Sequence, residues 1–160
     1  MSTINDLSEQ ERWILRLLYA PQNKSDGDIT IEGRTRLVKG LFLIERMFAD
    51  RFSDFRGTGF DFEPYKYGPF DQDVYDSLES LEERGLVKEV PTHPENGDRI
   101  ELTSQGKRTG EEVFMNLRPE QKSHLSWIKG KHVQQPVAQL LSFVYNKYPD
   151  MAENTEYKGF

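Results

Sequence analysis

The chain has 160 residues, a formal net charge of −6, 36% hydrophobic residues and no cysteine. This length predicts one domain that can bury a real hydrophobic core. The absence of cysteine excludes disulfides, cysteine-based zinc sites and thiol catalysis. The mild acidic excess gives no bulk attraction to nucleic acid. No apolar run is long enough to span a bilayer and the N-terminus lacks the pattern of a secretion signal, so we expect a cytoplasmic protein without a membrane partner.

Two helices are expected in the first part of the chain. The apolar residues of the first recur at positions i, i+1, i+4 and i+5 and are Trp13, Ile14, Leu17 and Leu18. Ser8 and Glu11 form a capping-box pattern before it, and Pro21 ends it. A short β-like piece at residues 29–31 leads to a second helix at about residues 33–52. The apolar face of this helix carries Leu37, Leu41, Ile44 and Phe48. We therefore place it at the centre of the core.

The middle of the chain predicts a helix, a hairpin and another helix, in that order. The apolar positions of the first of these helices include Val74, Leu78 and Leu81. We expect it to begin at Gly68-Pro69, because proline is tolerated in the first turn of a helix. Two β-like runs at residues 86–91 and 99–102 flank Asn96-Gly97, a pair typical of tight turns with positive φ. Thr103 then opens the next helix.

Two further helices are expected to open at Pro119 and Pro136, and residues 151–160 are expected to form a frayed tail. The order of the elements predicts an α+β fold. We expect a single winged helix-turn-helix-like domain at residues 1–150, with additional C-terminal helices that extend it from about residue 118.

Three segments together carry a family resemblance. They are a G-R-x-x-L-x-K helix start at Gly33 to Lys39, an F-x-x-Y-x-Y-G-P segment at Phe62 to Pro69, and V-Y-N-K-Y-P at Val144 to Pro149. In this combination the chain resembles the YwgA-like family of uncharacterised proteins and, more distantly, the Panacea domain of SocA-type antitoxins and proteolytic adaptors. The helix–hairpin–helix order is similar to the second half of a winged helix-turn-helix domain of the PadR or MarR type. The resemblance implies a winged-helix-like fold and a regulatory or interaction role, and it implies no catalytic residue.

The third expected helix is the one that would enter the major groove of DNA in a winged helix. Its segment carries six acidic residues against Arg84 alone, namely Asp71, Asp73, Asp76, Glu79, Glu82 and Glu83. Because phosphate neutralisation supplies most of the affinity for DNA, this helix disfavours DNA as a partner. The simpler expectation is that these acidic residues form a solvated helix face, whose members in the first turn interact favourably with the helix dipole.

Basic residues occur elsewhere in the chain. The candidates for nucleic-acid contact are Arg34, Arg36 and Lys39 at the start of the second helix and Lys88 and Arg99 in the hairpin. A later basic set consists of Lys107, Arg108, Arg118, Lys122, Lys129 and Lys131. For most of these residues the simpler expectation is a solvated surface position.

No pattern for catalysis or metal binding is present. The histidines are His93, His124 and His132, and the last two are not spaced as a ligand pair on one helical turn. The sequence contains no HExxH motif, no nucleophile elbow and no Gly-rich phosphate loop. We therefore predict no catalytic, metal or cofactor-binding residues, and we do not expect an enzyme.

The aromatic segment at residues 60–70 is the main candidate for partner binding. Tyr65, Tyr67 and Phe70 lie close to prolines that keep this segment extended, and such rigid aromatic residues make good interface anchors. The alternative is that these rings pack into the core.

The sequence as a whole favours a non-enzymatic regulatory or interaction protein of the antitoxin-like, adaptor or defence-associated kind, with a protein partner. The alternative is a winged-helix transcriptional regulator that binds DNA, with a homodimer through the terminal helices left open.

Overall fold

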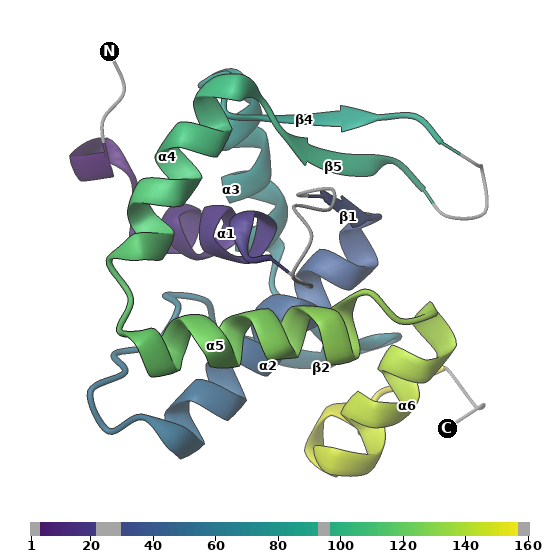
Figure 1. Ribbon diagram of the computed structural model, residues 1–160. Coiled ribbons are helices and arrows are strands. Elements are labelled where there is room, and N and C mark those ends of the chain that lie inside the picture. The colour runs from purple at the N-terminus through teal and green to yellow at the C-terminus, as the bar shows by residue number, and fades with distance from the viewer. Residues whose placement is uncertain (1–3, 22–29, 93–96, 157–160) are drawn as a thin grey trace.

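The computed structural model describes residues 4–21, 30–92 and 97–156 (Figure 1). It contains both helices and strands, which confirms the expected α+β class. The helices are η1 (Ile4–Asp6), α1 (Glu9–Tyr19), α2 (Arg34–Arg51), α3 (Gln72–Glu83), α4 (Ser104–Met115), α5 (Pro119–Ile128), the π-helical turn η2 (Lys129–Val133), α6 (Val137–Lys147) and η3 (Pro149–Ala152). The strands are β1 (Thr30–Glu32), β2 (Glu63–Tyr65), β3 (Gly68–Phe70), β4 (Val87–Val90) and β5 (Arg99–Leu102).

The strands form two antiparallel sheets. The larger has the order β1-β5-β4, with Ile31 opposite Ile100 and Val87 opposite Leu102. In Figure 1 this sheet lies at the top of the molecule, beside α3 and α4. The smaller sheet is the β2–β3 hairpin, which contacts α2, α6 and η3.

The core is centred on α2, as expected from its sequence. Leu37, Leu41, Ile44 and Phe48 are fully buried. The helix contacts α1, α5, α6 and β3, and α5 crosses in front of it in Figure 1. On α3, Leu78 and Leu81 are also fully buried, so the predicted register of that helix is confirmed. In the part of the chain that the structure describes, no helix is long and apolar enough to cross a membrane.

Local capping explains why several helix starts agree with the sequence. At α1, the Ser8 hydroxyl accepts from the backbone of Glu11 at 3.0 Å, and the Ser8 backbone donates to the Glu11 carboxylate at 2.8 Å. At α4, the Thr103 hydroxyl accepts from the backbone of Gly106 at 3.0 Å. Such caps satisfy N–H groups that have no partner inside the helix. In the predicted Asn96-Gly97 turn, Gly97 has a φ of 74°, and Asn96 lies outside the described residues.

The predicted start of α3 at Gly68-Pro69 is wrong. These residues belong to β3, where Pro69 lies opposite Pro64, so neither position needs a backbone donor toward its partner. Gly68 has a φ of 96°, which suits the end of the Lys66-Tyr67 turn and not a helix. The helix begins only after Asp71, whose carboxylate accepts from the backbone of Asp73 at 2.9 Å.

The prediction of a frayed tail is wrong as far as residue 156. Met151 is buried, and the Tyr148 ring packs edge-on against Phe42 at 5.3 Å between centroids. Beyond it, the Glu156 backbone donates to the Lys66 carbonyl at 2.7 Å, and this contact joins the segment to the β2–β3 hairpin. Residues 157–160 lie outside the described part of the chain.

Candidate functional site

The β2–β3 hairpin presents two tyrosines to solvent. Tyr65 is 54% exposed and Tyr67 is 53% exposed. The base of the hairpin is held tightly: a side-chain carbon placed on Gly68 would lie 3.4 Å from Lys39 Cε and 3.6 Å from the Tyr145 hydroxyl. Since these contacts come from α2 and α6, the exposed rings stand on a well-anchored support.

A row of aromatic rings continues from the hairpin onto α3. The Tyr65 and Phe70 centroids are 5.6 Å apart, and those of Phe70 and Tyr75 are 5.4 Å apart. Phe70 is half-buried and packs against the core. Of the three predicted partner-binding residues, the structure therefore exposes Tyr65 and Tyr67 and uses Phe70 to connect Tyr65 to the body of the molecule.

At the Tyr75 end of this row, the side chain of Arg34 packs on the aromatic ring. Its guanidinium carbon lies 4.8 Å from the centre of the Tyr75 ring. Its Nη2 and Nε donate to the two carboxylate oxygens of Glu89 at 2.6 and 3.0 Å. Glu79 and Glu82 lie 3.5 and 3.8 Å from the guanidinium. This geometry makes Arg34 a connection between α2, α3 and β4.

The three carboxylates around Arg34 are placed in unequal environments. The hydrogen bond from Arg34 holds the pKa of Glu89 below its usual value. Burial raises the pKa of Glu82 to about 6, and the negative charge of Glu89 adds to the rise. Arg34 is itself stabilised in the charged state, because its hydrogen bond with Glu89 raises its pKa.

The other predicted nucleic-acid contacts also face inward or are paired. Arg36 donates to the backbone carbonyls of Gln135 and Glu32 at 3.0 and 2.8 Å. Lys39 is buried, and this burial lowers its pKa to about 8. In the hairpin, Arg99 lies 3.0 Å from Glu32, and Lys88 lies 3.8 Å from Glu101. The structure does not bring these five residues together as one free cationic surface.

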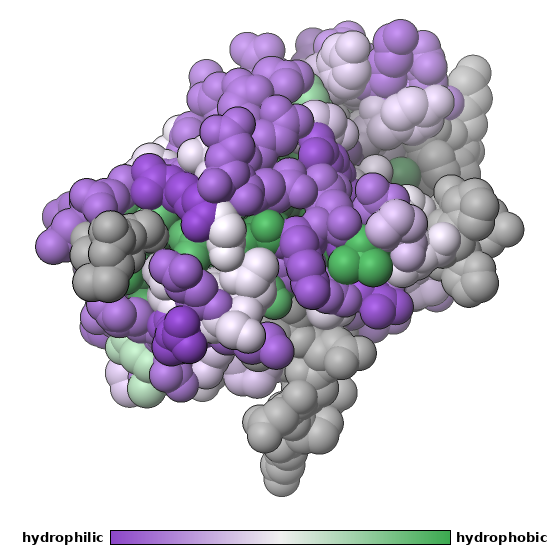
Figure 2. Space-filling model, turned by 90° about the horizontal axis from the view of Figure 1, so that it is seen from above, coloured by the Kyte–Doolittle hydropathy of each residue, from purple (hydrophilic) through white to green (hydrophobic). Residues whose placement is uncertain are grey.

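The solvent-facing side of α3 is acidic, as the sequence predicts. Its exposed residues include Gln72, Asp73, Asp76, Glu79 and Glu83. The end of the molecule at which β4 and β5 lie is covered mostly by hydrophilic side chains (Figure 2). The exposed face of α3 would therefore repel the phosphates of DNA.

A groove between α2, α5 and α6 was not predicted from the sequence. It has a volume of about 820 Å³ and is lined by Met47, Asp50, Arg51, Glu120, Ser123, His124, Trp127 and Lys147. Trp127 is 47% exposed and stacks on His124 at 5.6 Å. The sequence feature that could have indicated this groove is the spacing of His124 and Trp127, which lie three positions apart on α5. The charges along the groove are mixed, so they do not select one ligand class.

Within the described residues, the histidines do not form a metal site with other ligand side chains. Nε2 of His124 and Nε2 of His132 are buried without a hydrogen-bond partner in that part of the chain. Burial lowers the pKa of both rings. Both rings pack against aromatic side chains: His124 stacks on Trp127 at 5.6 Å, and His132 stacks on Phe143 at 3.8 Å. His93 lies outside the described residues.

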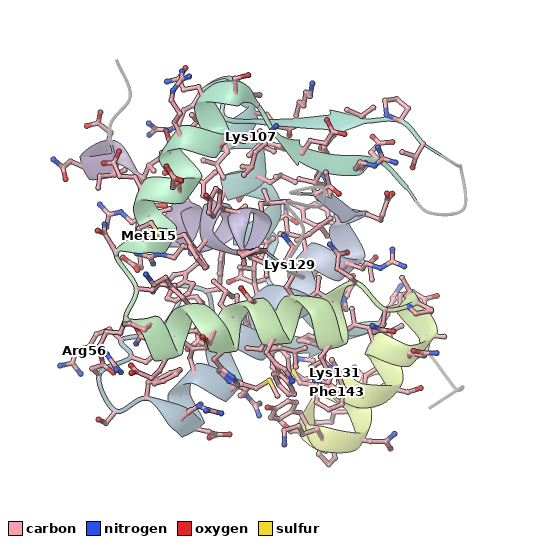
Figure 3. The ribbon with its side chains drawn as sticks, in the orientation of Figure 1. Arg56, Lys107, Met115, Lys129, Lys131 and Phe143 are labelled. Carbon is pink, nitrogen blue, oxygen red and sulfur yellow. The ribbon has the colours of Figure 1, made fainter. Side chains whose placement is uncertain are left out.

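Lys129 departs from the expected surface position. It is fully buried, and its Nζ donates to the backbone carbonyls of Leu18 and Ala20 at 2.7 and 2.9 Å. Figure 3 places it between α5 and α1. Burial lowers the pKa of Lys129 to about 7. The amine satisfies carbonyls at the C-terminus of α1, which is a structural role.

In comparisons with known proteins, no family model matches the sequence, and no curated protein shows significant similarity to it.

Proposed function

We propose that this protein is a non-enzymatic regulator with a winged-helix-like fold that acts by contact with another protein. The observation that carries the proposal is the pair of half-exposed tyrosines, Tyr65 and Tyr67, on an anchored hairpin. Tyrosines offer large contact areas and lose little conformational freedom on binding, so they are frequent anchors of interfaces. An antitoxin-like, adaptor or defence-associated role in the cytoplasm fits this mode of action.

The arrangement of the elements supports the winged-helix part of the proposal. The chain runs α1, β1, α2, the β2–β3 hairpin, α3, β4 and β5, and β1 pairs with β5, the second strand of the long hairpin. Helices followed by a hairpin whose second strand pairs with an earlier strand are expected for a winged helix, and here the β2–β3 hairpin is inserted between α2 and α3. The helices α5 and α6 then form the C-terminal extension.

The second candidate is a DNA-binding transcriptional regulator, and this same arrangement favours it. Electrostatics weigh against it. In a winged helix α3 would face DNA, and here its exposed side is acidic. Arg34, which borders α3, is already held by Glu79, Glu82 and Glu89. Few cations remain there to neutralise phosphate.

The test compares Tyr65→Ala and Tyr67→Ala with Met115→Ala, a control at a residue that is 57% exposed on α4. Tagged variants are used to capture partners from cells that express the protein naturally, and melting temperatures are measured in parallel. Each tyrosine variant is expected to weaken binding of the captured partner by about 2 kcal/mol while the fold stays intact. Equal loss in the Met115 variant, or loss of binding only in proportion to unfolding, would contradict the proposal.

A further inference from the structure

One end of the aromatic row is already in contact with a guanidinium of the chain itself, that of Arg34. Its guanidinium lies 4.8 Å from the centre of the Tyr75 ring and shares two hydrogen bonds with Glu89. A guanidinium is well suited to this position, because its flat face stacks on an aromatic ring and its edge matches a carboxylate. A tyrosine ring beside a carboxylate is thus an arginine-binding arrangement on this surface.

A tyrosine ring and a carboxylate also lie at the β2 end of the row, in Tyr65 and Glu63. Glu63 and Tyr65 are two positions apart on β2, so their side chains lie on the same face of the strand. Glu63 is opposite Phe70, against which the Tyr65 ring packs at 5.6 Å. Both residues are exposed, and within the described residues no ion pair occupies Glu63.

The residues around the aromatic row add negative charge, which is complementary to a cationic ligand. Asp73, Asp76 and Glu79 are exposed on α3, the helix that also carries Tyr75. The guanidinium of Arg34 is already engaged, and Lys39 is buried beneath the hairpin. Lys66 is exposed in the turn of the hairpin, but the exposed carboxylates of Glu63, Asp73, Asp76 and Glu79 outnumber it. The field around the aromatic row is therefore negative, and it attracts a cationic segment.

We propose that the row of Glu63, Tyr65, Phe70 and Tyr75 is a docking surface for an arginine-rich segment of a protein partner. An arginine of the partner stacks on Tyr65 and pairs with Glu63, as Arg34 stacks on Tyr75 and pairs with Glu89. Further basic side chains face the acidic side of α3. This inference rests on the proposed function and names the chemical class of its partner.

The test uses fluorescence anisotropy with two labelled peptides of about twelve residues, in which arginine or lysine alternates with glycine and serine. At an ionic strength of about 50 mM, the arginine peptide is expected to bind at least about threefold more tightly than the lysine peptide. Equal binding of the two peptides would mean a general charge effect and would overturn the inference.

Variants of the full chain locate the binding. Tyr65→Ala is expected to weaken the arginine peptide about fivefold, whereas Tyr65→Phe retains the ring and the affinity. Glu63→Gln is expected to weaken it about threefold. Glu112→Gln is the matched control, because it removes the same charge from an exposed position on α4. Equal loss in the Glu112 and Glu63 variants would overturn the proposed position.

Two further outcomes separate this inference from the proposed function. If neither peptide binds while partner capture still depends on Tyr65 and Tyr67, the arginine-rich class is wrong and the interface remains. If a duplex DNA probe binds more tightly than the arginine peptide and depends on Tyr65, both proposals fail. Melting temperatures of all variants ensure that a loss of binding is not a loss of folding.

Discussion

Lys129 shows how a charged residue can serve inside the core. In the described part of the chain its Nζ meets two backbone carbonyls and no carboxylate. The carbonyls belong to the end of α1, where the helix dipole is negative and the last C=O groups lack helical partners. The interaction therefore stabilises the charged amine, but burial opposes it more strongly and lowers its pKa to about 7 from 10.5.

This shift predicts a pH dependence of folding. Between about pH 7 and 10.5 the unfolded chain binds a proton at Lys129 that the folded chain does not hold, so stability rises with pH in this window. Below about pH 7 both states are protonated and the contribution levels off. Denaturant unfolding of Lys129→Met should show a flatter rise than the natural chain. Lys107→Met, at an exposed position, should keep the natural slope, and an unchanged slope in the Lys129 variant would contradict this account.

At the scale of elements, the junction between α3, β4 and α4 is closed by backbone contacts. The Thr103 backbone donates to the Leu86 carbonyl at 3.0 Å, and the Thr103 hydroxyl donates to the Gly85 carbonyl at 2.6 Å. Gly106, in the first turn of α4, comes so close that a side-chain carbon placed on it would lie 1.8 Å from the Leu86 oxygen. Only glycine permits this approach of helix and strand.

The substitution Gly106→Ala tests this close approach, because it changes the free energy of unfolding through two opposing effects. Helix propensity alone predicts a gain of about 1 kcal/mol, whereas the clash predicts a loss of about 3 kcal/mol or more. The two effects have opposite signs, so the free energy of unfolding in denaturant distinguishes them. Gln105→Ala, at the exposed neighbouring position, should change stability by less than about 0.5 kcal/mol. A Gly106 variant as stable as the natural chain would refute the close packing.

For the whole molecule, the distribution of charge matters more than the net charge. Acidic residues occupy the exposed side of α3, while Arg34, Arg36, Lys88 and Arg99 are engaged with carboxylates or carbonyls of the chain itself. Cations held in this way contribute little to the release of counterions from DNA. The helix α3 itself carries no lysine or arginine, so its exposed face offers no cation to a phosphate.

The protein is accordingly expected to bind random duplex DNA more weakly than about 10 μM at a salt concentration of about 150 mM. A gel shift or anisotropy titration measures this directly. The slope of log affinity against log salt reports how many phosphates are neutralised, and we expect it to be small. Sub-micromolar binding with a steep slope would instead place the DNA-binding regulator ahead of the protein-contact regulator.

The sequence by itself determined the elements whose signals are local. The capping box of Ser8 and Glu11, the apolar spacing of Leu78 and Leu81 and the helix start at Pro119 all correspond to observed features. Each depends on residues within a few positions of one another, so periodicity and capping suffice to predict it. The acidic face of α3 followed from the same local patterns, whereas the sequence left open whether the rings near Pro64 are exposed or packed in the core.

Only the tertiary structure decided which charged groups are free. Arg34 meets Glu89 across 55 residues of sequence, and Lys129 meets Leu18 across 111. A basic residue in a sequence gives no sign of such a distant partner, so both looked like surface cations. The docking of residues 154–156 on the β2–β3 hairpin likewise joins distant segments, because Asn154 donates to the Pro64 carbonyl and the Glu156 backbone donates to the Lys66 carbonyl. Burial and long-range partners, which no short window of residues contains, set the charge of this protein's exposed surface.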